Sequence, residues 1–179
     1  MYTPKRMNIP HRMNPPPQRM NAPNRPGGMF PHTVTVYNTV IEYDDSYNET
    51  LANHITILRG VLMQASLVDN VRTTGDPGAD SVILYIPHNV TAVDGVTGKK
   101  RKYARPMDFW KMDDHSEYWT LSGGREGNKD TATFFIKGEV VEPERDRAFL
   151  ESSYDDVYSV TKVDHLDFGG LPHFEVGGV

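Results

Sequence analysis

Residues 161–179, TKVDHLDFGGLPHFEVGGV, alternate polar and apolar side chains on either side of Gly169-Gly170. Period-two alternation is typical of a β-strand with one buried face. Paired glycines favour a tight turn because glycine adopts the positive φ angles that such turns need. The segment therefore predicts a β-hairpin with strands at residues 156–164 and 171–176. Such an element favours a small β-module that assembles through its edges and loops over an enzyme.

The same alternation continues through the body of the chain from Phe30 onward. Strands are predicted at residues 32–41, 54–65, 80–87, 117–121 and 131–141. Gly60 is expected to form a bend or bulge, and residues 44–53 and 69–79 to form loops. About eight short strands predict an all-β fold, a small β-barrel or sandwich with long loops. The predicted core includes Val34, Val36, Ile83, Tyr85, Phe135 and Val160.

One short helix is predicted, at residues 143–153. Pro143 suits a first helical turn, and Glu144 suits the positive end of the helix dipole. Ala148, Phe149 and Leu150 are expected to share one apolar face.

Composition limits the chemistry that the chain can perform. Its 179 residues suffice for one domain of ordinary size, and the absence of cysteine excludes disulfides, thiolate metal sites and a thiol nucleophile. No apolar run approaches the ~18 residues that a membrane span needs. The first residues lack the apolar core of a signal peptide, so we expect synthesis and use in a cytoplasm, without a membrane partner.

Residues 1–29 form a basic arm and residues 30–179 an acidic body. The arm holds five of the 19 basic residues and no acid, which leaves 14 basic against 24 acidic residues in the body. Seven prolines predict extended chain. The arm is either a disordered tail or a segment that binds neighbouring subunits; direct DNA binding is less favoured because Tyr2 is its one aromatic residue. Its candidate contact residues are Arg6, Met7, Arg12, Met13, Arg19, Met20 and Arg25.

A second basic cluster lies at residues 94–106, where a glycine-containing turn precedes a run of cations. It is either a solvated loop tip or a loop that faces an acidic partner or a phosphate backbone. The candidate contact residues are Lys99, Lys100, Arg101, Lys102 and Arg105.

Catalytic and metal-binding motifs are missing from the sequence, and no catalytic residue, metal ligand or cofactor is assigned. Asp113-Asp114-His115 is interpreted as a solvated turn, and His32 as a hydrogen-bonded structural residue. His165 and His173 flank the predicted turn and could approach each other, although a metal site would need further ligands. The chain is therefore expected not to be an enzyme.

Four blocks resemble the head-closure, or stopper, family of tailed phages with long non-contractile tails, which includes minor capsid proteins of Firmicutes phages. They are FPHTVTVY at residues 30–37, RGVL at 59–62 followed by DSVILYIP at 80–87, FIKG at 135–138, and VTKVD at 160–164 followed by DFGG at 167–170 and HFEV at 173–176. Each block is short, but their order and spacing span residues 30–179.

The resemblance implies a small β-barrel subunit of a ring beneath the portal and adaptor of a virion neck. Such rings close the DNA channel and present a surface to tail-terminator or tail-tube proteins, and their long loops line the channel or reach adjacent rings. The alternatives left open are a tail terminator, another minor capsid or decorating protein, and a monomeric ligand-binding β-barrel. The basic arm departs from the family pattern, so the resemblance assigns it no role.

Overall fold

The computed structural model describes residues 28–43, 47–66, 81–124 and 129–179. Seven of its strands form one curved antiparallel sheet, and the other two form a short parallel pair. The strands are β1 (His32–Tyr43), β2 (Glu49–Ser66), β3 (Ser81–Pro87), β4 (Thr91–Asp94), β5 (Lys102–Tyr103), β6 (Tyr118–Trp119), β7 (Phe134–Lys137), β8 (Val157–Leu166) and β9 (His173–Gly178). The helices are α1 (Pro106–Phe109) and α2 (Arg147–Ser153), with a 3-10 turn at Lys129–Thr131. The predicted all-β fold is confirmed.

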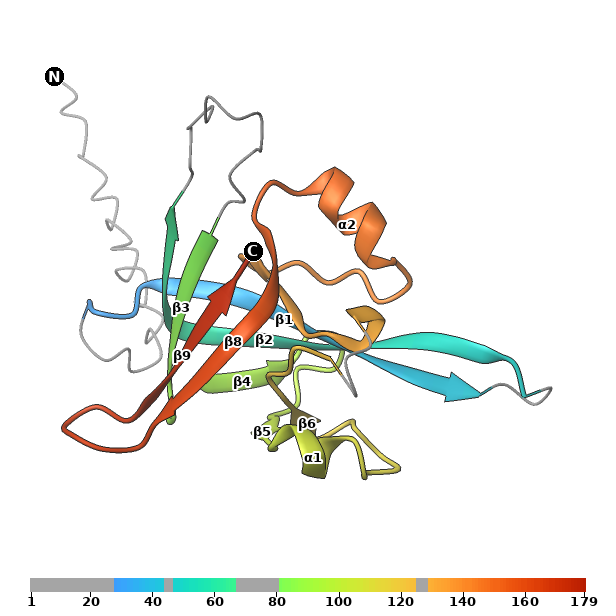
Figure 1. Ribbon diagram of the computed structural model, residues 1–179, viewed down its shortest axis with the longest axis horizontal. Helices are drawn as coiled ribbons and strands as arrows, with labels where there is room; N and C mark the ends of the chain where they lie inside the picture. Colours follow the sequence, from blue (N-terminus) through green and yellow to red (C-terminus); the bar gives the residue numbers. More distant parts are fainter. Residues whose placement is uncertain (1–27, 44–46, 67–80, 125–128) are drawn as a thin grey trace, which may run out of the picture.

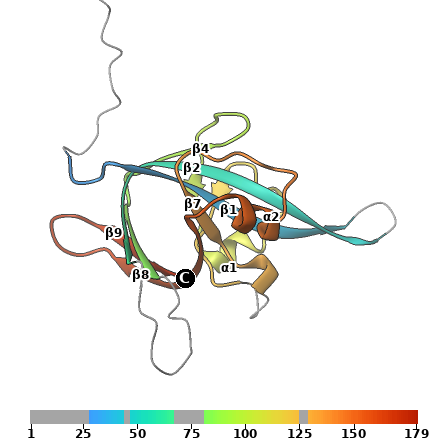
Figure 2. The same ribbon diagram turned by 90° about the horizontal axis from the view of Figure 1, so that it is seen from above.

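The sheet closes into a barrel. Its strands pair in the order β1-β7-β8-β9-β3-β2, and β2 pairs again with β1. β4 is added to the free edge of β2, next to β3 (Figure 1). The curvature of the strands is visible in Figure 2. Because a closed barrel leaves few free strand edges, lateral strand addition is not the obvious route to assembly.

Two glycines supply the backbone geometry that this closure needs. Gly60 has φ +89°, and the register between β1 and β2 shifts opposite it, where Thr33 faces Arg59 and His32 faces Val61. The predicted bulge is therefore confirmed, and it lets β2 continue from β1 to β3. Gly169, with φ +83°, lies in the turn that joins β8 to β9, which confirms the predicted C-terminal hairpin.

Side chains fill the barrel interior. The main cluster includes Val34, Val36, Phe135 and Val160, which confirms four of the six predicted core residues. Trp119 and the following residues enter this interior from β6. The amide of Asn38 holds them there, since it donates to the carbonyl of Thr120 at 2.9 Å and accepts from its N–H at 3.1 Å.

The orientation predicted for β3 was wrong. Val82, Leu84 and Ile86 are buried, whereas Ile83 is 38% exposed and Tyr85 is half-buried. The run of apolar residues had suggested a strand buried on both faces. In a closed barrel one face of each strand points outward, so only alternate residues reach the core.

Several predicted boundaries also changed. Residues 49–53 belong to β2 rather than to a loop, and β4 and β5 lie in a region where no strand was predicted. The structure has two helices instead of one, and α2 begins at Arg147. Asp146 caps it by accepting a hydrogen bond from the N–H of Phe149 at 2.8 Å, so Pro143 precedes the helix.

The apolar face predicted for α2 is reduced to one residue. Leu150 is buried with Tyr37 and Phe134, whereas Phe149 is partly exposed beneath the guanidinium of Arg145, 4.5 Å from its ring centre. Within the described ranges, both helices are too short to cross a membrane.

Candidate assembly surfaces

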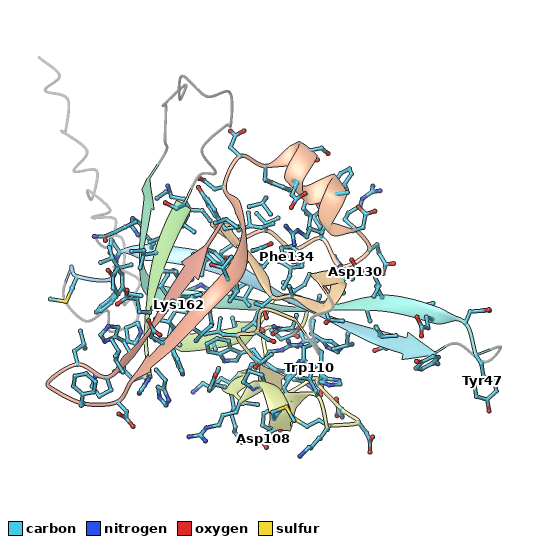
Figure 3. The ribbon with its side chains drawn as sticks, in the orientation of Figure 1. Tyr47, Asp108, Trp110, Asp130, Phe134 and Lys162 are labelled. Carbon is cyan, nitrogen blue, oxygen red and sulfur yellow. The ribbon has the colours of Figure 1, made fainter. Side chains whose placement is uncertain are left out.

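The β1–β2 hairpin projects far beyond the barrel (Figure 1). From Asn38 to Tyr43, β1 pairs with β2 alone, because its pairing with β7 covers Val34 to Tyr37. The outer part of the hairpin, residues 41–51, is here called the tip. Tyr47 is 87% exposed at its end, as Figure 3 shows, and Tyr43 and Leu51 are also exposed. A two-stranded ribbon with exposed aromatic side chains is typical of an interaction element.

The tip is acidic as well as aromatic. Glu42 and Glu49 lie exposed near the ends of β1 and β2, and the hydroxyl of Tyr43 donates to Glu49 at 3.2 Å. The sequence adds Asp44 and Asp45 between the strands. A cationic and partly aromatic surface would complement this tip.

The C-terminal hairpin carries a second exposed apolar group. Phe168 is 74% exposed in the turn between β8 and β9, and Leu171 is exposed beside it. In Figure 1 this turn and the β1–β2 tip lie at opposite ends of the molecule.

A concave surface separates α1 and β5 from β8 and β9. It comprises two overlapping hollows of about 480 and 550 Å³, here called the α1 pocket. Both are lined by Tyr103, Arg105, Asp108, His165 and Phe174. Phe174 forms the wall, with its ring centre 4.5 Å from that of Tyr103 and 4.8 Å from that of His165. The pocket therefore offers aromatic side chains, imidazole nitrogens, one guanidinium from Arg105 and one carboxylate from Asp108.

Four of the five predicted basic contact residues are available to a partner. Lys99, Lys100, Lys102 and Arg105 are exposed, and within the described part of the chain none of them forms an ion pair. Arg105 also lines the α1 pocket.

The prediction for Arg101 was wrong. Its side chain is buried, and its Nη2 lies 2.5 Å from Oδ2 of Asp94. Nη1 donates to the hydroxyl of Thr56 at 3.1 Å. Because a buried guanidinium needs a carboxylate to offset its desolvation, this cation serves the fold rather than a partner.

Asp94 is itself held ionised by its neighbours. Burial alone would raise its pKa, but hydrogen bonds from Thr97 and the charge of Arg101 outweigh burial, and the pKa falls below its usual value.

His54 lies beside this ion pair and is largely buried, which favours its neutral form. Burial, followed by the positive charge of Arg101 and by His115, lowers its pKa to about 4. Its ring centre lies 5.3 Å from that of His115, which stacks on Phe109 of α1.

The other histidine predictions have mixed outcomes. His32 is confirmed as structural, since its Nδ1 accepts a hydrogen bond from the N–H of Met63 at 3.0 Å. His165 and His173 do not meet, because they pair with Phe174 and Leu166 in the hairpin; His165 packs on His88 instead. In the predicted solvated turn the two aspartates are exposed, but His115 is partly buried. Among the described residues, no three potential metal ligands come together.

An acidic groove borders α2 and was not predicted. It has a volume of about 520 Å³ and is lined by Asp130, Glu144, Asp146 and Glu151, together with Arg145 and Arg147 and with Leu51 from the tip. Asn53 of β2 fixes its floor by donating to the carbonyl of Arg145 at 2.9 Å. The density of acidic residues at 142–151 could have indicated an acidic surface from the sequence. Their proximity to β2 could not have been predicted.

Two predicted segments lie outside the described residues. One is the predicted loop at residues 69–79, and the other is the arm with its candidate contact residues Arg6, Met7, Arg12, Met13, Arg19, Met20 and Arg25.

Neither a curated protein nor a solved structure matches the chain. A family model does match it over residues 29–179, which contain every strand and both helices described above. The description of that family is "Family of unknown function (DUF6751)". Since the match covers most of the chain, this protein belongs to the DUF6751 family.

Proposed function

We propose that this protein is a structural subunit of a phage virion neck, where copies of it form a head-closure ring between the portal or adaptor and the tail. The proposal has two supports: the sequence resemblance of residues 30–179 to stopper proteins, and the architecture of the barrel. The observation that carries it is that two hairpins with exposed aromatic residues leave a closed barrel in opposite directions (Figure 1).

The physical argument starts from the barrel. Closure pairs most strand edges, so copies must associate through projecting elements and loops. The β1–β2 tip projects, whereas the α1 pocket beside β8 and β9 is hollow, so the two suit a heterologous contact better than a self-complementary one. Heterologous contacts close into a ring when the rotation per subunit divides a full turn.

The exposed cations suit the channel or a neighbouring ring. Lys99 and Lys100 lie on the loop between β4 and β5, Lys102 begins β5, and none of the three has a carboxylate partner in the described chain. A ring would repeat this loop around its axis, and such a repeated cluster can attract packaged DNA or an acidic platform protein.

The acidic groove beside α2 of a neighbouring subunit is the acceptor for the basic arm in this proposal. Guanidinium groups pair well with carboxylates, and Leu51 adds an apolar contact for methionine.

One experiment distinguishes the alternative functions. A tail terminator or a decorating protein would also be a virion component, at another position or copy number. A monomeric ligand-binding barrel is disfavoured because Trp119, Leu121 and Phe135 occupy the barrel interior.

The test is a reconstruction of particles in which the protein carries a small C-terminal label, combined with native mass spectrometry of purified neck complexes. We expect several copies in one closed ring at the head-tail junction. A single copy per particle, a position on the capsid surface, or absence from particles would contradict the proposal.

A further inference from the structure

We propose that the β1–β2 tip of one copy docks into the α1 pocket of the next copy, so that Tyr47 enters an aromatic hollow and the acids of the tip face Lys102 and Arg105. This inference rests on the proposed self-assembly and deepens it, because it identifies the two surfaces that meet.

The tip has the composition of an interface anchor. Tyr43 and Leu51 are exposed on the paired strands, and Tyr47 is exposed just before β2 begins. Tyrosine contributes a large apolar face with few rotatable bonds and is enriched among residues that dominate binding energies. Tyr47 also has φ +61°, a conformation that non-glycine residues rarely adopt. Its side chain projects from the end of the hairpin (Figure 3).

The α1 pocket has the complementary form. It is concave where the tip is convex. Tyr103 and Tyr118 are partly exposed and supply aromatic surface for an incoming tyrosine, while the buried Phe174 packs behind Tyr103. Met112 and Met107, which line its two hollows, can adapt to the shape of a partner. His88 and His165 add nitrogen atoms that can bond a phenol.

Charge separates the two surfaces in the sense that docking requires. The tip has Glu42 and Glu49 in the structure and Asp44 and Asp45 in the sequence. The pocket has Arg105 on its lining, with Lys102 exposed three residues before it and Asp108 as its one acidic lining residue among the described residues. Opposite charges would steer the approach and fix the register of the contact.

A contact within one chain is excluded by distance along the molecule. Figure 3 places Tyr47 at the far end of the hairpin, well away from Asp108 on α1. A tip that binds a different surface on the next copy produces a head-to-tail chain, which is the arrangement that a ring needs.

Cysteine cross-linking tests the contact directly, because the chain has no cysteine of its own. Asn48→Cys places a thiol beside Tyr47 and leaves that side chain intact, and Met107→Cys places a second thiol at the rim of the pocket, where Met107 is 68% exposed. The control pairs Asn48→Cys with Ser153→Cys, an exposed residue at the end of α2. Full-length protein at high concentration is oxidised and separated without reductant.

We expect the Asn48→Cys/Met107→Cys variant to give a ladder that extends beyond dimers, with at least tenfold more product than the control. A product that stops at dimers would overturn the head-to-tail arrangement, and a yield equal to that of the control would overturn the contact.

Charge reversal provides a second, independent test of the contact. In the cross-linking background, Glu42→Lys/Glu49→Lys and Lys102→Glu/Arg105→Glu should each reduce the yield at least tenfold, and a mixture of the two variants should restore it. Failure of the mixture to recover would also overturn the proposal.

These results are separable from the test of the proposed function. A neck ring without the Met107 cross-link would leave the function standing and reject this contact. A cross-linked ladder from a chain that is absent from necks would support this contact and reject the proposed function.

Discussion

Asp94 and Arg101 form a buried ion pair across the loop that holds the exposed lysines, with Oδ2 and Nη2 2.5 Å apart. Asp94 ends β4 and Arg101 precedes β5, so the pair closes residues 95–100 into a compact turn. Backbone bonds support it, since the N–H of Asp94 donates to the carbonyl of Lys99 at 2.7 Å and that of Gly98 to the carbonyl of Asp94 at 2.9 Å. The ion pair therefore determines which cations of the run reach solvent.

Asp94→Asn should strongly destabilise the protein, because it leaves the guanidinium of Arg101 buried without a carboxylate. Breaking one partner of a buried pair costs about 3–5 kcal/mol of unfolding free energy. The measurement is urea unfolding followed by tryptophan fluorescence. Glu139→Gln is the matched control, since it breaks the exposed pair with Arg59 and should cost at most about 1 kcal/mol. Equal losses for the two variants would show that burial of the Asp94 pair has no special weight.

His54 should make the stability depend on pH in a defined window. Its pKa is about 4 in the folded protein, against about 6.5 in an unfolded chain. Between these values the unfolded chain binds the additional proton. The unfolding free energy therefore falls as pH drops from about 6.5 to about 4, by roughly 1 to 3 kcal/mol, and is constant with respect to this group above about 6.5. Glu42, 3.9 Å away, is too exposed to prevent this loss.

The check for His54 is the difference between wild type and His54→Gln in urea midpoints from pH 4.5 to pH 7.5. The variant should lack this part of the slope, whereas His165→Gln, which changes an exposed histidine of β8, should retain it. Parallel curves for wild type and His54→Gln would contradict the assignment.

Local patterns predicted the parts of the fold that depend on local physics. The C-terminal hairpin follows from alternation around Gly169-Gly170, and the bulge follows from Gly60 within an apolar strand. The orientation of β3 did not follow, because five consecutive apolar residues fit either face equally well. Only the closure of the barrel decides that Leu84 points inward and Ile83 outward.

The candidate surfaces were predictable only in part, for a related reason. A run of cations does not reveal which member is buried, although Asp94 stood seven residues before Arg101 across a glycine-containing turn and could have indicated the pair. The α1 pocket joins Tyr103 to His165 and Phe174, which are far apart in the sequence. Pairing of β8 with β9 and packing of α1 below them are needed to bring these residues together.

The two glycines near the C-terminal end of β9 should respond differently to alanine. A Cβ at Gly178 would lie 2.9 Å from a methyl group of Val82, 3.1 Å from the carbonyl oxygen of Ser159 and 3.2 Å from the ring of Phe135. The backbone at Ser159 and the buried ring of Phe135 cannot both move to make room for this Cβ. Gly178→Ala should therefore lower the free energy of unfolding by about 1–3 kcal/mol. At Gly177 the nearest atoms are 3.5 Å away, which is an ordinary contact. Gly177→Ala should change stability by less than about 1 kcal/mol. Thermal unfolding of both variants checks this, and the reverse order would show that the barrel seam is not packed as described.

Deletion of residues 1–28 should leave the body folded and weaken its incorporation into particles. All three core clusters of the described chain are built from residues after Phe30, so the thermal midpoint of the isolated body should stay nearly unchanged. The arm instead offers cations to an acidic body. An exposed ion pair contributes only ~0.2–1 kcal/mol, whereas a fully buried methionine contributes ~1.5–3 kcal/mol.

Within the arm, methionine should therefore matter more than arginine. Replacing the three methionines of the repeats by serine should reduce incorporation more than replacing the four arginines by glutamine; the positions are Met7, Met13 and Met20, and Arg6, Arg12, Arg19 and Arg25. Quantitative blotting of purified particles against a capsid protein gives the measurement. Unfolding of the isolated body on deletion would assign the arm to the fold. Wild-type incorporation of the deleted chain would show that assembly proceeds without the arm. A larger loss from the arginine variant would mean that the ion pairs of the arm are buried at the contact. A buried charge that is left without its partner costs far more than an exposed one.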